Sequence, residues 1–399
     1  MSIRSSLALF RVPSFTPALL AILFSVLAEA VAGSYMALLA VQKIGMSPLE
    51  LSAFLTLSAV SGIVVTTLFG HLHDKRPVMW PLLLALCAKI LGYGLCAVLT
   101  ETWMLLANAF VLFGLSSASF ALLFALAKGY LDRVGGDAVG RGMAGLRLVS
   151  SLAWAIGPAL GAGLVAAWSF TGVYLGASLL AAVALVVVLA SRVKVVPADS
   201  AERQKITLDV VKAAAPAVIA MTAFHTVMFM GSNAMSIIVV TELGTETDVG
   251  LLFSLCAALE VVVMSLFVVR PVDGTNRGLL LLGFALFAVY FLMPLMWPTL
   301  ASLYWGQIPR AIAIGILSIV GMAHIQALLP GRAGVASALF GNTMSAGFLL
   351  SGLGTGLWAQ GLGYWSLFTV CAVLCVIGGA VLYWPMRRVP EAAGSESAP

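Results

Sequence analysis

The chain has 399 residues, of which 61% are hydrophobic and only 9% are charged. Soluble domains are about one-quarter charged, so this composition excludes an ordinary soluble enzyme or nucleic-acid-binding domain and indicates a polytopic membrane protein. The net charge of +5 reflects a topological pattern of basic residues, described below. The five cysteines all lie in apolar runs, and neither their odd number nor their spacing fits a metal site. We therefore expect no metal and no cofactor.

Apolar runs of about 20 residues predict transmembrane helices. In chain order there are twelve, at 16–41, 49–70, 78–99, 102–126, 142–167, 171–191, 215–241, 248–269, 278–297, 299–324, 333–357 and 363–384. The first run resembles a secretory signal, because Ala28-Glu29-Ala30 has the shape of a cleavage site. The run continues to Val41, however, so we interpret it as an uncleaved first membrane helix. The predicted fold class is an all-α membrane protein.

The longest polar break, Arg192 to Lys212, divides the runs into two groups of six. We expect an N-terminal six-helix bundle at 1–191, a cytoplasmic linker at 192–214, a C-terminal six-helix bundle at 215–386 and a disordered cytoplasmic tail at 387–399. Segments on one side of the membrane hold seventeen Lys and Arg residues, whereas loops on the other side hold only Lys43. Since basic loops stay in the cytoplasm, both termini are expected there.

The two halves also resemble each other. At an offset of 199 residues Ile44–Val60 matches Leu243–Leu259, and at an offset of 191 Gly140-Arg141 matches Gly331-Arg332. Two parallel six-helix repeats predict a substrate site near the membrane midplane, between the halves.

A loop motif follows the second predicted helix. It reads GHLHDKR, from Gly70 to Arg76, and resembles the cytoplasmic G-x-L-x-D-K/R signature of the major facilitator superfamily. We expect Asp74 to accept from helix-terminal amides or to pair with a basic residue, and with Arg76 to latch the cytoplasmic face. His71 and His73 are interpreted as loop residues rather than metal ligands, because no third and fourth ligands are near.

A second motif lies in the fifth predicted helix, where Gly157 and Pro158 are followed by Gly161. It resembles the GPxxG signature associated with antiporters, and ordinary packing through small residues is the competing interpretation. Because a Gly-Pro pair also kinks a membrane helix, we assign these three residues to conformational change.

A narrower resemblance rests on four segments. Phe120–Asp132, Leu146–Gly161, Glu242–Glu260 and Leu328–Gly352 are similar to the bacterial sugar efflux transporter family. The most specific part is LPGRAG with the Ser-, Thr- and Asn-dotted helix that follows it. The resemblance implies two pseudo-symmetric six-helix bundles and proton-driven export of small sugars and glycosides across the inner membrane.

Three residues within predicted spans are candidates for proton coupling. A charge in the hydrocarbon costs at least about 2.5–3.5 kcal/mol, so each requires a partner or a role. Glu29 either carries the proton or is a structural partner of Lys89 or Arg310. Glu260 is the second candidate. His225 is the third, and it is equally well explained as a structural histidine.

Six residues are candidates for substrate binding. Arg147 and Trp154, seven residues apart, share one face of the fifth predicted helix. Their spacing is similar to that in lactose permease, where such a pair binds and stacks the sugar. An indole packs on the C–H face of a sugar and Arg donates to its hydroxyls, although Arg147 would also serve as a gate. The other candidates are Asn233, Gln307, Arg310 and Asn342.

Together these features predict a secondary active transporter that exports a small sugar or glycoside by proton antiport with alternating access. The alternative is a multidrug or other small-molecule proton antiporter of the same fold. An enzyme is not expected, because no GxSxG, HExxH or paired Asp motif lies in a predicted span. The expected partners are the substrate, with the proton as coupling ion, and the lipids of the bacterial inner membrane. We expect no nucleic acid and a monomer.

Overall fold

The computed structural model describes residues 15–75, 78–134, 137–191, 208–269, 276–330 and 332–383. Arg76, the predicted C-terminal tail and residues 192–207 of the predicted linker lie outside these ranges.

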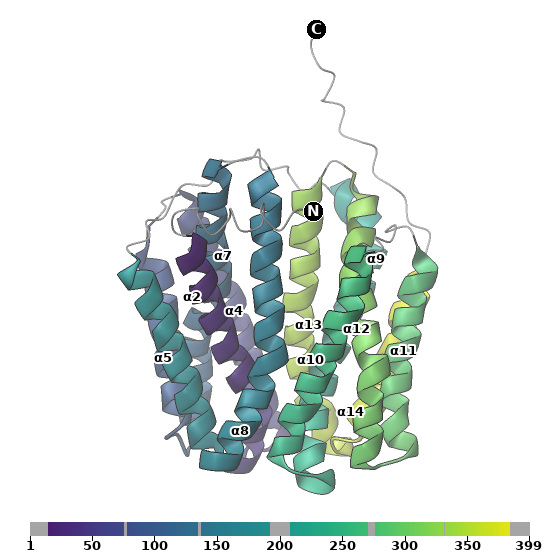
Figure 1. The fold of residues 1–399 in the computed structure, drawn as a ribbon. Coiled ribbons are helices and arrows are strands. Elements are labelled where there is room, and N and C mark those ends of the chain that lie inside the picture. Colours follow the sequence, from purple (N-terminus) through teal and green to yellow (C-terminus); the bar gives the residue numbers. More distant parts are fainter. Residues whose placement is uncertain are drawn as a thin grey trace. The chain divides into compact units, whose positions relative to one another are not determined.

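Every regular element within the described ranges is helical (Figure 1). The N-terminal half contains α2 (Phe15–Gly33), α3 (Met36–Leu38), the π-helical η2 (Leu39–Lys43), α4 (Pro48–Lys75), α5 (Trp80–Cys96), α6 (Thr102–Asn108), η3 (Ala109–Phe113), α7 (Gly114–Val134) and α8 (Asp137–Ala190). The C-terminal half contains α9 (Leu208–Ile238), η4 (Val239–Leu243), α10 (Glu246–Val269), α11 (Arg277–Met296), α12 (Leu300–Leu328), α13 (Ala333–Leu362) and α14 (Ser366–Val381). Helices suit so apolar a chain, because each backbone polar group finds its partner within its own segment.

Each of the twelve predicted runs coincides with described helical residues, but not one run to one helix. The runs 142–167 and 171–191 both lie in α8, which leaves helical geometry at Trp168 and Ser169. The run 16–41 is divided between α2, α3 and η2 by a turn at Ser34 and Tyr35. By length and composition, eight described helical stretches could cross a membrane, and two shorter apolar helices accompany them. The total of twelve spans and the cytoplasmic termini stay predictions.

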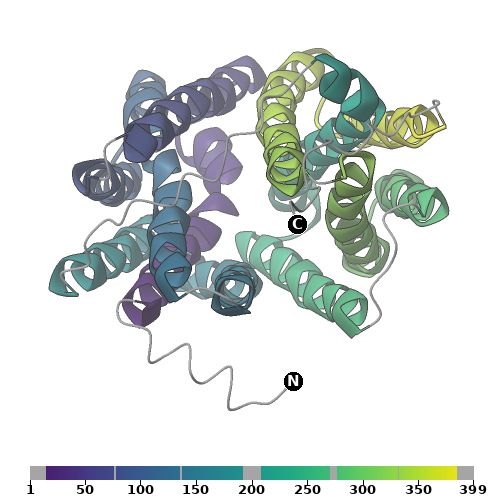
Figure 2. The ribbon, with the colours of Figure 1, turned by 90° about the horizontal axis from the view of Figure 1, so that it is seen from above.

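By their internal contacts the residues form two compact units. The first comprises Met1–Ala201 with Ser236–Ala257, and the second comprises Glu202–Met235 with Ala258–Pro399. The first unit therefore includes η4 and the first part of α10. Figure 2 shows the helices from above, so that most of them are seen nearly end-on.

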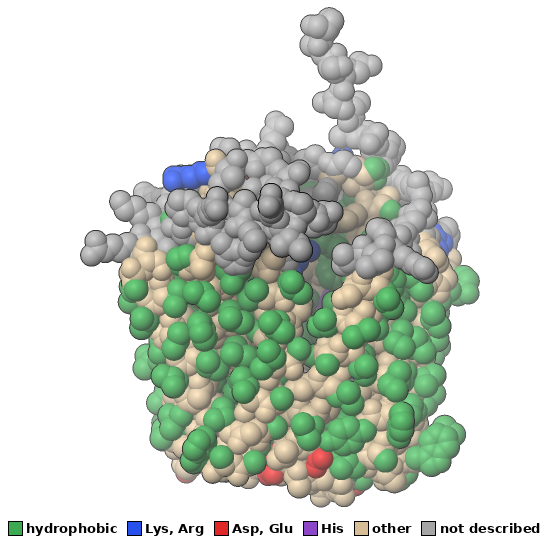
Figure 3. Space-filling view, viewed as in Figure 1, with side chains coloured by type: hydrophobic (Ala, Val, Ile, Leu, Met, Phe, Trp, Pro, Cys, Tyr) green, Lys and Arg blue, Asp and Glu red, His purple; other side chains and the backbone are tan. Residues whose placement is uncertain are grey.

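The outer flanks of the helices are apolar. Figure 3 shows hydrophobic side chains over this surface, with acidic side chains at its lower edge. Large hydrophobic side chains such as Leu68, Val98 and Leu266 are exposed. Inside the first unit, Ile22, Leu86 and Leu126 form part of a buried core contributed by α2, α5 and α7. An exposed apolar surface around an apolar core is what a lipid environment requires.

Glycines set the closest helix contacts, and the same contact recurs in both units. In the first unit Gly157 of α8 lies against the backbone between Ala30 and Val31 of α2. In the second unit Gly347 of α13 lies against the backbone between His225 and Thr226 of α9. The GPALG motif is thus a packing surface, as its competing interpretation holds.

The end of the first helix of each repeat is also duplicated. η2 and η4 are both five-residue π-helical segments; Gly244 directly follows η4, and Gly45 follows η2 after one intervening residue. A capping box then starts the next helix: Ser47 N donates to Glu50 Oε2 at 2.8 Å, and Thr245 N donates to Asp248 Oδ2 at 2.9 Å. This duplicated local structure lies at the start of the segments that match at an offset of 199 residues.

Candidate functional site

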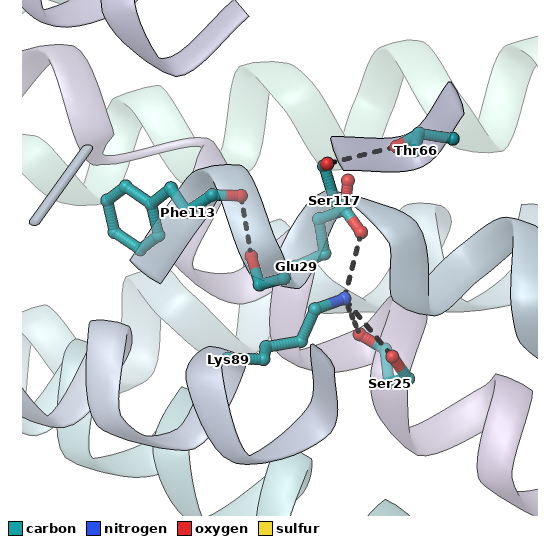
Figure 4. Close-up of polar contacts among 7 residues, drawn as sticks. Ser25, Glu29, Thr66, Lys89, Phe113 and Ser117 are labelled. Atoms are coloured by element: carbon teal, nitrogen blue, oxygen red, sulfur yellow. Dashed lines mark hydrogen bonds and ion pairs between the residues drawn. The ribbon is translucent and has the colours of Figure 1, made fainter. Parts of the chain in front are cut away.

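A buried lysine and a half-exposed carboxylate meet between α5 and α2 (Figure 4). Lys89 Nζ lies 3.3 Å from Glu29 Oε2, 3.1 Å from Ser25 Oγ and 3.5 Å from the Ser25 carbonyl oxygen. The Lys89 side chain is 3% exposed, whereas that of Glu29 is 45% exposed. The ammonium therefore has the counter-charge and the acceptors that a buried cation requires. Of the two partners predicted for Glu29, the structure places Lys89 beside it.

The Trp154 indole of α8 lies beside Gly33, which is one helical turn beyond Glu29 on α2. Glu29 and Gly33 are four residues apart on α2 and so lie on one face of the helix, about one turn from each other. Gly33 is exposed, and a Cβ atom added to it would lie 3.7 Å from Trp154 Cη2 of α8. Trp154 is 40% exposed. A half-exposed acid and a half-exposed indole thus both lie next to an exposed residue without a side chain, and we call this group of residues the Gly33 gap (Glu29, Gly33 and Trp154).

Arg147 is exposed on α8. It precedes Trp154 by two helical turns, or about 10 Å of rise. The shared face of Arg147 and Trp154 stays a prediction from their spacing, and two turns of helix place Arg147 outside the Gly33 gap.

A second polar cluster surrounds Arg310 in the second unit. The Arg310 guanidinium donates to Gln307 Oε1 at 3.1 Å and to Ser232 Oγ at 2.7 Å, and it lies 5.4 Å from the centre of the Tyr290 ring. Met235 Sδ is 3.6 Å from Nη1. Arg310 and Gln307 are buried. This direct hydrogen bond places Gln307 and Arg310, which are three residues apart, on one face of α12.

His225 is buried against α13. Its Nδ1 lies 2.9 Å from the Met221 carbonyl oxygen and 3.1 Å from Thr343 Oγ1. Since a carbonyl oxygen only accepts, Nδ1 carries the hydrogen in the neutral ring and Nε2 is the basic nitrogen. The Phe224 and Phe340 rings also lie near the imidazole. These contacts match a structural histidine and leave Nε2 as the atom for any proton transfer.

The remaining predicted residues are dispersed. Asn342 is exposed on α13, while Asn233 on α9 and Glu260 on α10 are half-buried.

Asp74 lies in the last turn of α4, but its side chain, like all of Arg76, is outside the described part. Pro158 lies inside α8, and its carbonyl oxygen accepts from Tyr35 Oη at 3.4 Å. Within the described ranges no group of three or more His, Cys, Asp or Glu side chains could hold a metal ion.

Several side chains that contact the predicted residues were not expected from the sequence. Ser25 is four residues before Glu29, so the helical period alone could have paired them. Ser232 is adjacent to the predicted Asn233, and only the rotation of α9 decides which of the two reaches Arg310. Thr343, next to the predicted Asn342, is the α13 residue whose hydroxyl contacts the His225 ring of α9.

Comparison with known proteins identifies the family. A model of the Major Facilitator Superfamily matches residues 18–230 and again residues 217–399. A Deinococcus radiodurans protein that carries the name sugar efflux transporter is 36% identical, covering 92% of this chain and 97% of that protein. The chain belongs to the sugar efflux transporter family of the major facilitator superfamily. It is accordingly a multi-pass membrane transporter and not an enzyme.

More distant relatives agree with this assignment. Sugar efflux transporter A of Escherichia coli is 27% identical over 84% of this chain and 87% of its own length. Among solved structures, a nucleoside transporter superposes with a TM-score of 0.70 at 14% identity and covers 92% of this chain and 100% of its own. A peptide transporter in complex with sulfate has a TM-score of 0.72 at 14% identity, covering 92% of this chain and 94% of its own. At such identity the likeness shows the fold alone.

Proposed function

We propose that this transporter exports small sugars or glycosides across the bacterial inner membrane by proton antiport with alternating access. The observation that carries the proposal is the Glu29 carboxylate, half-exposed at the Gly33 gap and held from behind by a buried lysine. The sugar class is supported by the names of relatives up to 36% identical to this chain.

Proton coupling needs a group that tolerates both a charged and a neutral state within the membrane. When Glu29 is ionised, Lys89 balances its charge at 3.3 Å. When Glu29 is protonated, the ammonium keeps both contacts with Ser25. Lys89 therefore has hydrogen-bond acceptors in either state, which avoids the large cost of an unpartnered buried cation. In the proposed cycle Glu29 binds a proton on the outer side and releases it inside as substrate loads.

Substrate binding is assigned first to Trp154, because its half-exposed indole offers a flat apolar surface beside a hydrogen-bonding carboxylate. Arg147 and Asn342, both exposed, and the half-buried Asn233 are proposed to donate to sugar hydroxyls. Gln307 and Arg310 are buried in this conformation, so in the proposed cycle they reach substrate only in another state.

Two further roles complete the proposed cycle. Glu260 and His225 are secondary proton sites. Asp74, Arg76 and the GPALG residues act in the conformational change.

The proposal is tested with the purified full-length protein in proteoliposomes that contain a pH-sensitive dye. We expect added sugar to drive proton flux, and Glu29→Gln to abolish this flux while sugar exchange between the two sides continues. Exchange survives because it requires binding and reorientation but no net proton release. Glu101→Gln is the matched control, since Glu101 is exposed and its side chain makes no capping bond at α6. Undiminished flux in Glu29→Gln would remove this carboxylate from the mechanism.

A second candidate function follows from the same gap. A half-exposed carboxylate beside an indole also suits an organic cation, through charge attraction and a cation–π contact. A multidrug antiporter would use it in this way. A competition panel of sugars against lipophilic cations separates the two: competition by sugars alone supports the sugar exporter, and competition by cations alone supports the alternative.

A further inference from the structure

The ligand class that the Gly33 gap accepts depends on its net charge. Glu29 and Trp154 alone would present one negative charge beside an aromatic face, which is how proteins recognise organic cations. Behind Glu29, however, Lys89 Nζ lies 3.3 Å from Oε2. The pair is formally neutral, so its attraction for a distant cation is small compared with that of an isolated carboxylate.

Lys89 acts from a position that a ligand does not reach. Its side chain is 3% exposed, and its other contacts are with Ser25 of α2. The 45% exposed carboxylate and the 40% exposed indole, by contrast, are both open at the gap. Arg147 is two turns away along α8, about 10 Å from Trp154 in rise, so it does not replace Lys89 as the neutralising charge at the gap.

We propose that Lys89 is a specificity-determining residue: by cancelling the charge of Glu29 from the buried side, it makes the gap between Glu29 and Trp154 a site for neutral polar ligands, and its loss converts that gap into an organic-cation site. The proposal rests on the proposed function only in that the Gly33 gap faces the ligand. Lys89 does not touch the ligand. It acts through Glu29, as a positioning and neutralising residue.

The test measures binding of ethidium, a planar organic cation, to the full-length protein in detergent by fluorescence anisotropy. We expect Lys89→Met, which removes the charge and keeps a long unbranched side chain, to bind ethidium about tenfold or more tightly than the unmodified protein. A new ion pair between ethidium and Glu29, with a cation–π contact to Trp154, would give a gain of this size. Lys89→Arg should bind ethidium as weakly as the unmodified protein, because the charge remains. A Lys89→Met variant that folds but gains no ethidium affinity would overturn the proposal.

Two further variants assign the gain to this gap. In the Lys89→Met background, Glu29→Gln should return ethidium binding to its original weak level, because the gap is neutral again. Trp154→Ala in that background should remove a large part of the gain. A gain that survives both changes would place the cation elsewhere and contradict the proposal.

A folding defect is kept separate from a change of specificity by size-exclusion profiles and melting temperatures for every variant. Lys89→Gln, which keeps a donor for Ser25, is the second neutral variant. If both neutral variants fail to fold while Lys89→Arg folds, the charge is needed for structure, and the specificity assignment is wrong. Ethidium binding in detergent involves no proton gradient, so it does not depend on antiport. If the gain in ethidium affinity is found but proteoliposomes show no sugar-driven proton flux, the antiport proposal alone is contradicted.

Discussion

Glu29 combines two properties that seldom occur together in a membrane helix: it is acidic and it is 45% exposed. A charge at the centre of the hydrocarbon costs at least about 2.5–3.5 kcal/mol, so an exposed acid facing lipid is unfavourable. Lys89 reduces this cost from the buried side, and the exposed side is open at the Gly33 gap. The role of this residue thus depends on neighbours from α5 and α8 that lie far from it in sequence.

Filling the Gly33 gap should block ligand binding without disturbing the fold. A Cβ atom at Gly33 would meet Trp154 at 3.7 Å, an ordinary van der Waals distance, so Gly33→Ala should retain sugar binding. Gly33→Leu places a branched side chain between the carboxylate and the indole. We expect it to weaken sugar binding at least about tenfold, or 1.4 kcal/mol, in equilibrium dialysis. Equal binding by both variants would show that the gap is not where the sugar lies.

At the level of the element, α2 and α8 pack closely because glycines replace larger side chains at their contact. Gly157 lies against the backbone of Ala30 and Val31, and Gly161 lies against the Tyr35 ring. This contact fixes the rotation of α8 relative to α2, which in turn brings Trp154 next to Gly33. The motif therefore contributes to the site by positioning an aromatic residue one turn earlier in the same helix.

Substituting Gly157 should destabilise the protein, whereas a nearby glycine should tolerate the same change. A Cβ atom at Gly157 would lie 2.5 Å from Ala30 Cβ and 3.1 Å from the Ala30 carbonyl carbon, so the two helices must separate. We expect Gly157→Ala to cost about 1–3 kcal/mol, as overpacking does, and to lower the melting temperature in detergent. Gly163→Ala is the control, because its Cβ would meet nothing within 4 Å.

The same measurement tests whether the two repeats use equivalent contacts. In the second unit, a Cβ atom at Gly347 would lie 2.8 Å from both the His225 carbonyl carbon and the Thr226 nitrogen. Gly347→Ala should therefore lower the melting temperature by an amount similar to Gly157→Ala. An unchanged melting temperature in Gly347→Ala would limit the glycine contact to the first repeat.

At the level of the whole molecule, the distribution of basic residues predicts which side faces the cytoplasm, and the structure explains its one exception. Lys43 donates to the Cys96 carbonyl oxygen at 3.1 Å and to the Ala97 carbonyl oxygen at 2.7 Å, where α5 ends. Partial burial lowers the pKa of its amine. A cation at a helix C-terminus satisfies otherwise unpaired carbonyl groups, which gives Lys43 a structural reason to lie on the side with few basic residues.

The predicted orientation can be tested by labelling cysteines from one side of the membrane. Gln42 lies shortly before the start of α4 and Lys75 is its last residue; both are exposed, and the native cysteines are buried or half-buried. In right-side-out vesicles, Gln42→Cys should react with a membrane-impermeant maleimide, and Lys75→Cys should react only after permeabilisation. The cysteines already present in the unmodified protein provide the background control. The reverse pattern would invert the topology.

The amino-acid sequence by itself determined the helical membrane class, the internal repeat and the list of polar residues to consider, because hydrophobic runs and their flanking charges are local properties of the chain. It could not decide between Lys89 and Arg310 as the partner of Glu29, or between Ser232 and Asn233 as the contact of Arg310. Those choices depend on the rotation of each helix about its axis. In so apolar a chain hydrophobicity hardly distinguishes one helix face from another, and glycine contacts such as Gly157 with Ala30 set the rotation instead. Only the tertiary structure therefore showed that a buried lysine lies behind the exposed acid.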